Sequence, residues 1–126
     1  MFKQALIASA LCAVMAGCGS SGQQSTDGMP APYEAITVKV ENNNWQDIDV
    51  YAVNGGQRVR LGSVSTARTG AFVLPSSIAL SPDLRIRVHP LAAQRDYVSP
   101  RISPSPGDVV EVSVPNSLVQ TSVTVR

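Results

Sequence analysis

Apolar and polar residues alternate through most of the chain after residue 33. Ile36, Val38 and Val40, for example, are separated by Thr37 and Lys39. Because successive side chains of a strand point to opposite faces, this period of two predicts strands with one buried and one solvated face. The same pattern predicts strands at 48–53, 58–62, 72–74, 84–89, 97–102, 110–114 and 121–126.

Turn-forming residues separate these runs. Asn54-Gly55-Gly56 predicts a hairpin because Asn and Gly tolerate positive φ, and 42–44, 81–83 and 106–108 read as further turns. Pro100 interrupts the run 97–102, which is typical of an edge strand. Seven or eight short strands with turns every 8 to 12 residues indicate an all-β fold. We expect a small antiparallel β-sandwich, immunoglobulin-like or similar, with a small barrel as the alternative.

The inward positions of the predicted strands define the expected core. The residues expected to be buried together are Ile36, Val38, Val50, Leu61, Phe72, Ile86, Val88, Val112 and Val123.

The first 17 residues have the three parts of an export signal: Lys3, an apolar run over 5–15, and a small pair before a cysteine. The run is shorter than the roughly 20 residues of a spanning helix. Met15-Ala16-Gly17-Cys18 resembles the lipobox of bacterial lipoproteins, with an ordinary secretory signal as the alternative. The resemblance implies cleavage before Cys18, a diacylglyceryl thioether on its sulfur, and usually a further N-acyl chain. Several chains anchor stably, since each buried CH₂ contributes about 0.8 kcal/mol.

This resemblance also implies a location and a domain order. Gly19 follows the cysteine instead of aspartate, which in a host with two membranes implies the outer membrane, facing periplasm or surface. Residues 18–32 are rich in Gly, Ser, Gln, Thr and Pro, so we expect a lipidated flexible tether with a reach of about 20 Å. The folded domain is expected over 33–126. Without Cys12 and with Cys18 acylated, no thiol remains for a disulfide, a nucleophile or a zinc site.

Two segments of the domain suggest a relationship. The first comprises residues 40–52 and 56–62, and the second comprises Arg95-Asp96-Tyr97-Val98-Ser99 and residues 105–110. Both resemble segments of small, uncharacterised bacterial lipoproteins with one β domain. The resemblance supports the fold and implies no activity.

The net charge and the absence of known motifs argue against nucleic-acid binding and catalysis. Residues 18–126 contain nine basic and nine acidic residues, so we expect no nucleic-acid binding by bulk attraction. His89, the one histidine, is expected to be a solvated strand residue, and no nucleophile elbow or zinc-protease motif is present. We therefore expect that the protein is not an enzyme and binds no cofactor.

A metal site has one set of candidates. Glu41, Asn43, Asp47 and Asp49 supply hard oxygen atoms around one turn, as calcium prefers, but their spacing differs from an EF-hand loop. Turn chemistry, in which Asn and Asp bond nearby backbone, explains them better. We therefore expect no metal.

Four arginines are the clearest surface feature. Arg58, Arg60, Arg85 and Arg87 alternate with core positions and should face outward. If their strands share a sheet, they form a basic patch suited to carboxylates, phosphates or acidic glycans. The alternative is a solvated face paired with acids such as Glu41, Asp49 and Glu111.

Trp45, at the turn 42–44, is expected to cap one end of the core, with a sugar or partner contact as the alternative. The combined prediction is a lipid-anchored envelope protein that acts as a non-enzymatic interaction or structural module. An envelope-glycan or anionic-ligand binding module is the alternative.

Overall fold

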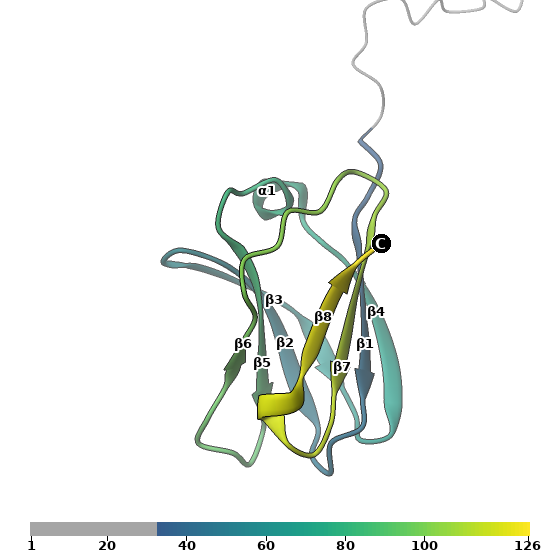
Figure 1. The fold of residues 1–126 in the computed structure, drawn as a ribbon, viewed down its shortest axis with the longest axis vertical. Helices are drawn as coiled ribbons and strands as arrows, with labels where there is room; N and C mark the ends of the chain where they lie inside the picture. The colour runs from purple at the N-terminus through teal and green to yellow at the C-terminus, as the bar shows by residue number, and fades with distance from the viewer. Residues whose placement is uncertain (1–32) are drawn as a thin grey trace, which may run out of the picture. The chain divides into compact units, whose positions relative to one another are not determined.

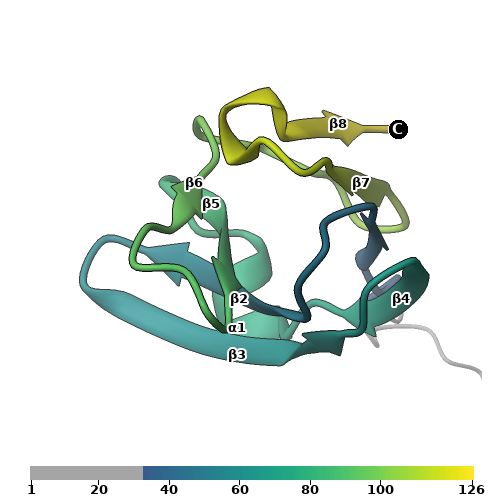
Figure 2. The ribbon, with the colours of Figure 1, turned by 90° about the horizontal axis from the view of Figure 1, so that it is seen from below.

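The structure is a computed structural model and describes residues 33–126. Two four-stranded sheets pack face to face, with strand orders β4-β1-β7-β8 and β3-β2-β5-β6 (Figure 1, Figure 2). The strands are β1 Thr37–Asn42, β2 Ile48–Asn54, β3 Gln57–Val64, β4 Arg68–Val73, β5 Leu84–Pro90, β6 Tyr97–Val98, β7 Val109–Val114 and β8 Ser122–Val125. The predicted small β-sandwich is therefore confirmed. The signal, Cys18 and the whole of the expected tether lie outside the described residues.

The pairing is antiparallel with one exception. β1 lies between β4, which runs antiparallel to it, and β7, which runs parallel to it, so that Val40 is opposite both Gly70 and Val112. In the other sheet, β2 is antiparallel to β3 and β5. The predicted hairpin at 54–56 joins β2 to β3, and Gly55 has the positive φ of +57° that such a turn requires.

The core lies between the two sheets. Six of the nine predicted core residues are buried, at 0–2% exposure: Ile36, Val38, Val50, Ile86, Val88 and Val112. Leu61, Phe72 and Val123 are only partly buried, and to this extent the prediction is wrong. They lie on β3, β4 and β8, which are outer strands of the two sheets. Outer strands are covered from fewer sides, so their inward side chains keep contact with water.

Short elements complete the domain. β6 is an edge strand, as predicted, but contains two residues, because Pro100 cannot donate a ladder hydrogen bond. The short helix α1 Ser76–Ala79 and the 3-10 turn Leu118–Gln120 were not predicted, since one turn leaves no periodic signal. Among the described residues, no helix is both long and apolar enough to cross a membrane.

Candidate functional site

The four arginines come together on the outer face of one sheet. Their strands, β3 and β5, lie on either side of β2. The register places Tyr51 of β2 between Arg60 and Arg87, and Val53 between Arg58 and Arg85. We call this surface the arginine face: Arg58, Arg60, Arg85 and Arg87, with Tyr51 and Val53 between them. The condition that the two strands share a sheet is met, although the strands are not adjacent.

Three of these arginines are paired with aspartates. Arg60 is 3.0 Å from Asp49, and Arg85 is 3.1 Å from Asp83. Arg87 forms an ion pair with Asp96. Exposed pairs of this kind contribute about 0–1 kcal/mol each. Most of the basic charge is thus balanced locally, as the solvated-face alternative expects.

The predicted acidic partners were only partly right. Asp49 does pair across the sheet. Glu41 and Glu111 lie on β1 and β7 of the other sheet, where Glu41 accepts from Asn43 and Glu111 pairs with Arg126 at 3.3 Å. The face is instead balanced by Asp83 and Asp96 from the segments that flank β5. Strand alternation contained no signal for them, because neither residue lies on a strand.

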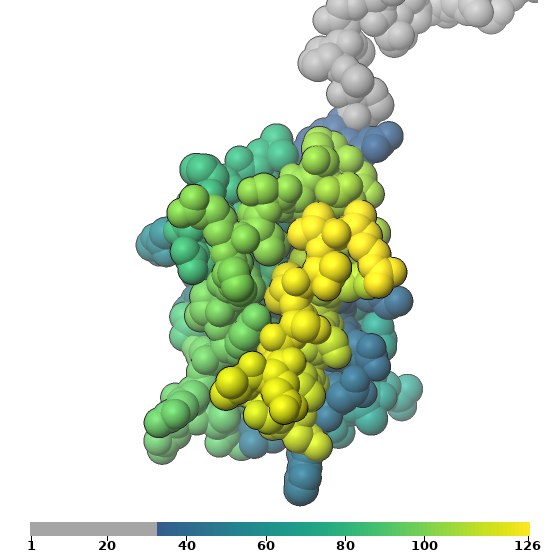
Figure 3. All heavy atoms as spheres, viewed as in Figure 1, coloured from purple at the N-terminus to yellow at the C-terminus, as the bar shows by residue number. Residues whose placement is uncertain are grey.

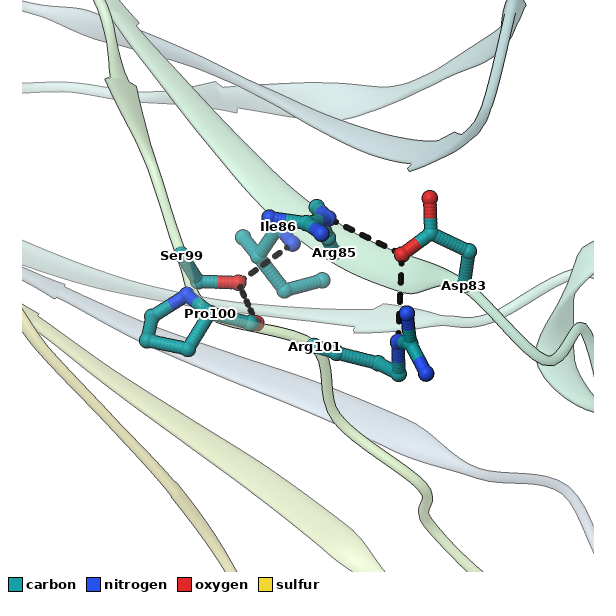
Figure 4. A network of polar contacts seen from close by, with 6 residues as sticks. All are labelled: Asp83, Arg85, Ile86, Ser99, Pro100 and Arg101. Atoms are coloured by element: carbon teal, nitrogen blue, oxygen red, sulfur yellow. Dashed lines mark hydrogen bonds and ion pairs between the residues drawn. The ribbon is translucent and has the colours of Figure 1, made fainter.

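Asp83 joins two arginines at the edge of the face. Figure 4 shows its carboxylate between Arg85 and Arg101, and Arg101 approaches it at 3.3 Å. Nearby, the buried Ser99 hydroxyl accepts the Ile86 N–H at 2.9 Å and donates to the Pro100 carbonyl at 2.8 Å. Ser99 therefore continues the pairing to β5 where β6 ends.

The aspartates are held as carboxylates. A hydrogen bond from Ser63, helped by Arg60, lowers the pKa of Asp49. The Arg85 hydrogen bond likewise lowers the pKa of Asp83. Burial raises the pKa of Asp96, but hydrogen bonds from His89 and Arg87 outweigh it and leave that pKa below its usual value. These aspartates therefore keep their negative charge, and the pairing persists, at neutral pH.

His89 faces outward, as predicted, and its Nδ1 is 2.5 Å from Asp96. Asp96 thus bridges His89 and Arg87, a cluster that sequence reasoning missed. Asp49 of β2 is paired with His89 of β5 on one side and with Ser63 of β3 on the other. The Ser63 hydroxyl donates to Asp49 and is separated from His89 by that strand. This order does not place a nucleophile next to the imidazole.

Arg58 differs from the other three arginines of the arginine face in its contacts. Within the described part of the chain it forms no ion pair, and its guanidinium lies 4.9 Å from the centre of the Tyr51 ring. Such stacking contributes about 0.5–1 kcal/mol at an exposed site. Arg58 and Arg87 line an open hollow of about 470 Å³ beside the β2–β3 hairpin, with Val53, Gly55, Gly56 and Gln57.

The calcium candidates do not form a ligand set. Asn43 donates to Glu41 at 2.9 Å, Asp47 accepts the Thr66 N–H at 2.9 Å, and Asp49 pairs with Arg60. In residues 33–126, no group of three or more acidic, histidine or cysteine residues is placed to hold a metal ion. The oxygen atoms of Glu41, Asp47 and Asp49 are thus used in hydrogen bonds and an ion pair within the protein.

Trp45 does not cap the core, so this prediction is wrong. Its side chain is 79% exposed. The end of the sandwich is filled by Asn42 and Asn44, which are buried and bond the turn from inside. The turn therefore directs Trp45 outward, over an open hollow of about 330 Å³. This hollow and the hollow beside Arg58 share no lining residue, so the structure does not combine Trp45 with Arg58 in one pocket.

Comparison with known proteins adds a structural likeness. No protein-family model and no curated protein matches the chain. A solved structure described as the NMR structure of the protein from Eubacterium rectale is similar, with a TM-score of 0.48 and 10% sequence identity. The match covers 78% of this chain and 94% of that chain.

Proposed function

We propose that this protein is a lipid-anchored, non-enzymatic interaction module of the cell envelope, and that it binds an anionic partner on the arginine face. The anchor is inferred from the lipobox-like residues that end in Cys18. The partner would carry carboxylates or phosphates, because the planar guanidinium donates paired hydrogen bonds to both.

The observation that most directly supports the proposal is the state of Arg58. It forms no ion pair among the described residues and is held over Tyr51 beside an open hollow. Arg87 lines the same hollow and is fixed by Asp96. One unneutralised guanidinium and one oriented guanidinium therefore face the same space, which suits a planar or tetrahedral anion.

Capture of envelope material tests the partner. The intact wild-type chain is compared with an Arg58→Ser, Arg60→Ser, Arg85→Ser, Arg87→Ser variant, in low and in physiological salt. A Lys39→Ser, Arg68→Ser, Arg95→Ser, Arg126→Ser variant has the same net charge and is the matched control. We expect the arginine-face variant alone to lose capture, and wild-type capture to weaken as salt screens the contacts. Equal capture by both folded variants would make the arginines a solvated face.

Fatty-acid labelling tests the anchor separately. The wild-type chain should incorporate labelled fatty acid, and Cys18→Ala should not. Unchanged labelling of the Cys18→Ala chain would refute lipidation at this residue and leave the arginine face untouched.

A further inference from the structure

The hollow beneath Trp45 has a composition unlike the arginine face. Its lining consists of one indole, three carboxamides and three apolar residues: Trp45, Asn44, Gln46, Asn116, Pro90, Ala93 and Leu118. It contains no ionisable side chain. Its volume of about 330 Å³ lies at the lower end of the range of roughly 300–1,000 Å³ for ligand pockets.

The turn that presents Trp45 is fixed from inside. Asn42 accepts the Asn44 N–H at 2.9 Å and donates to the Gln46 carbonyl at 2.9 Å, and Asn44 donates to the Pro115 carbonyl at 3.0 Å. The Asn44 carbonyl also accepts the Thr66 hydroxyl at 2.5 Å. A 79% exposed indole on a turn held by two buried amides is preorganised, so little ordering is needed when a ligand binds.

Two carboxamides that line the same hollow as the indole, those of Gln46 and Asn116, have free hydrogen-bonding atoms. Gln46 uses its side-chain oxygen to accept the Ala92 N–H at 3.1 Å. Within the described residues, the Gln46 side-chain nitrogen and the Asn116 carboxamide make no hydrogen bond. The hollow therefore offers a flat apolar surface beside uncharged donors and acceptors.

From this arrangement we infer that the Trp45 hollow is a binding site for a neutral saccharide. A sugar ring has an apolar face, which can stack on the indole, and a rim of hydroxyls, which the carboxamides can bond. The absence of charge in the lining disfavours acidic ligands. The turn between β1 and β2, which carries Trp45, lies at the opposite end of the domain from the point where the described chain begins (Figure 1). In Figure 3 the blue turn between β1 and β2 projects freely from that lower end.

Fluorescence tests the inference directly, because Trp45 is the one tryptophan of the chain. The intact chain, in detergent, is titrated with an N-acetylglucosamine trimer and with maltotriose. We expect at least one sugar to shift the emission to shorter wavelength and to protect the indole from acrylamide, with saturation in the millimolar range typical of a shallow site. Raising the salt should leave this binding unchanged, unlike binding at the arginine face.

Variants separate a sugar site from an apolar protein-docking surface. Gln46→Glu keeps the acceptor for Ala92 and removes the free amide donor, so we expect severalfold weaker binding. Trp45→Ala, followed by saturation-transfer NMR of the sugar, should lose about tenfold or more in affinity. Val119→Ala is the matched control, since Val119 is exposed near the same end of the domain but does not line the hollow.

No emission change with either sugar at tens of millimolar would overturn the inference. So would wild-type affinity in the Trp45→Ala or Gln46→Glu chain, or an equal loss in the Val119→Ala chain. Each of these results is independent of what the arginine face binds.

Discussion

Asn42 is the residue through which the structure makes its sharpest prediction about stability. It is fully buried at the end of β1 and makes three hydrogen bonds. Its side-chain nitrogen donates to the Gln46 carbonyl at 2.9 Å and to the Val64 carbonyl at 3.0 Å, and its oxygen accepts the Asn44 N–H. It thus joins the Trp45 turn to the end of β3, across the two sheets.

Asn42→Ala would leave these backbone groups without their partner. The bonds to Val64 and Asn44 are buried, and each buried group left unsatisfied costs about 1–3 kcal/mol. The expected loss for the two groups is therefore about 2–6 kcal/mol. A domain of this size is stable by about 5–14 kcal/mol, and each kcal/mol shifts its Tm by about 4–8 °C. A loss of about 3 kcal/mol should lower Tm by about 12–24 °C.

The assay is urea unfolding and thermal unfolding of residues 19–126, both followed by far-UV circular dichroism, because the exposed Trp45 is a poor reporter of the core. Asn43→Ala is the matched control. The neighbouring asparagine is exposed and its side chain bonds only Glu41, at 2.9 Å, so the substitution should cost less than about 0.5 kcal/mol. If Asn42→Ala is no more harmful than Asn43→Ala, the buried amides do not hold the turn.

Three further outcomes are expected in the same assay. Ile86→Ala, at a fully buried position of β5, should lower the free energy of unfolding by about 2–5 kcal/mol. Leu91→Ala, at a position that is 55% exposed, should lower it by less than about 0.5 kcal/mol. Equal losses would contradict the assigned core. Thr121→Val should be neutral or stabilising, because among the described residues the buried Thr121 hydroxyl has no hydrogen-bond partner; a loss above about 1 kcal/mol would disprove this. The pKa values of Asp49, Asp83 and Asp96 are lower in the folded protein than in the unfolded chain, where an aspartate has a pKa of about 3.9. The stability that these carboxylates contribute is therefore fully present above the unfolded pKa and is lost as the pH falls through the folded pKa. Stability should therefore fall on acidification below about pH 4, and an Asp49→Asn, Asp96→Asn variant should show a shallower fall; an identical slope would contradict the pKa shifts.

The sequence predicted the faces of strands better than their partners. Alternation is a local property, so it correctly placed Val50, Ile86 and Val88 inside and the four arginines outside. It could not reveal that β1 pairs in parallel with β7, because the side-chain period is the same in both kinds of sheet. It also overestimated the burial of Leu61, Phe72 and Val123, since the period of two does not tell an outer strand from a central one.

The errors around the candidate sites have a common physical cause. Asp83 and Asp96 reach the arginine face from irregular segments, whose course depends on the whole fold. Trp45 was expected to cap the core because large aromatic residues are usually buried. The structure fills that space with Asn42 and Asn44, whose amides satisfy the backbone of the turn. A sequence pattern does not show which of several neighbouring residues fills the end of a sandwich.

The balance of charge on the arginine face constrains how it could recognise a partner. Three of its four guanidinium groups have a carboxylate within ion-pair distance, so little positive potential extends into solvent. Long-range steering should therefore be weak, and association should not approach the fastest electrostatically assisted rates. Recognition would depend on short-range contact at Arg58, where no carboxylate has to be displaced. The three paired arginines would then keep the surface around Arg58 in a fixed conformation. A ligand that binds Arg58 would also contact Arg87, whose guanidinium is already positioned by its ion pair with Asp96.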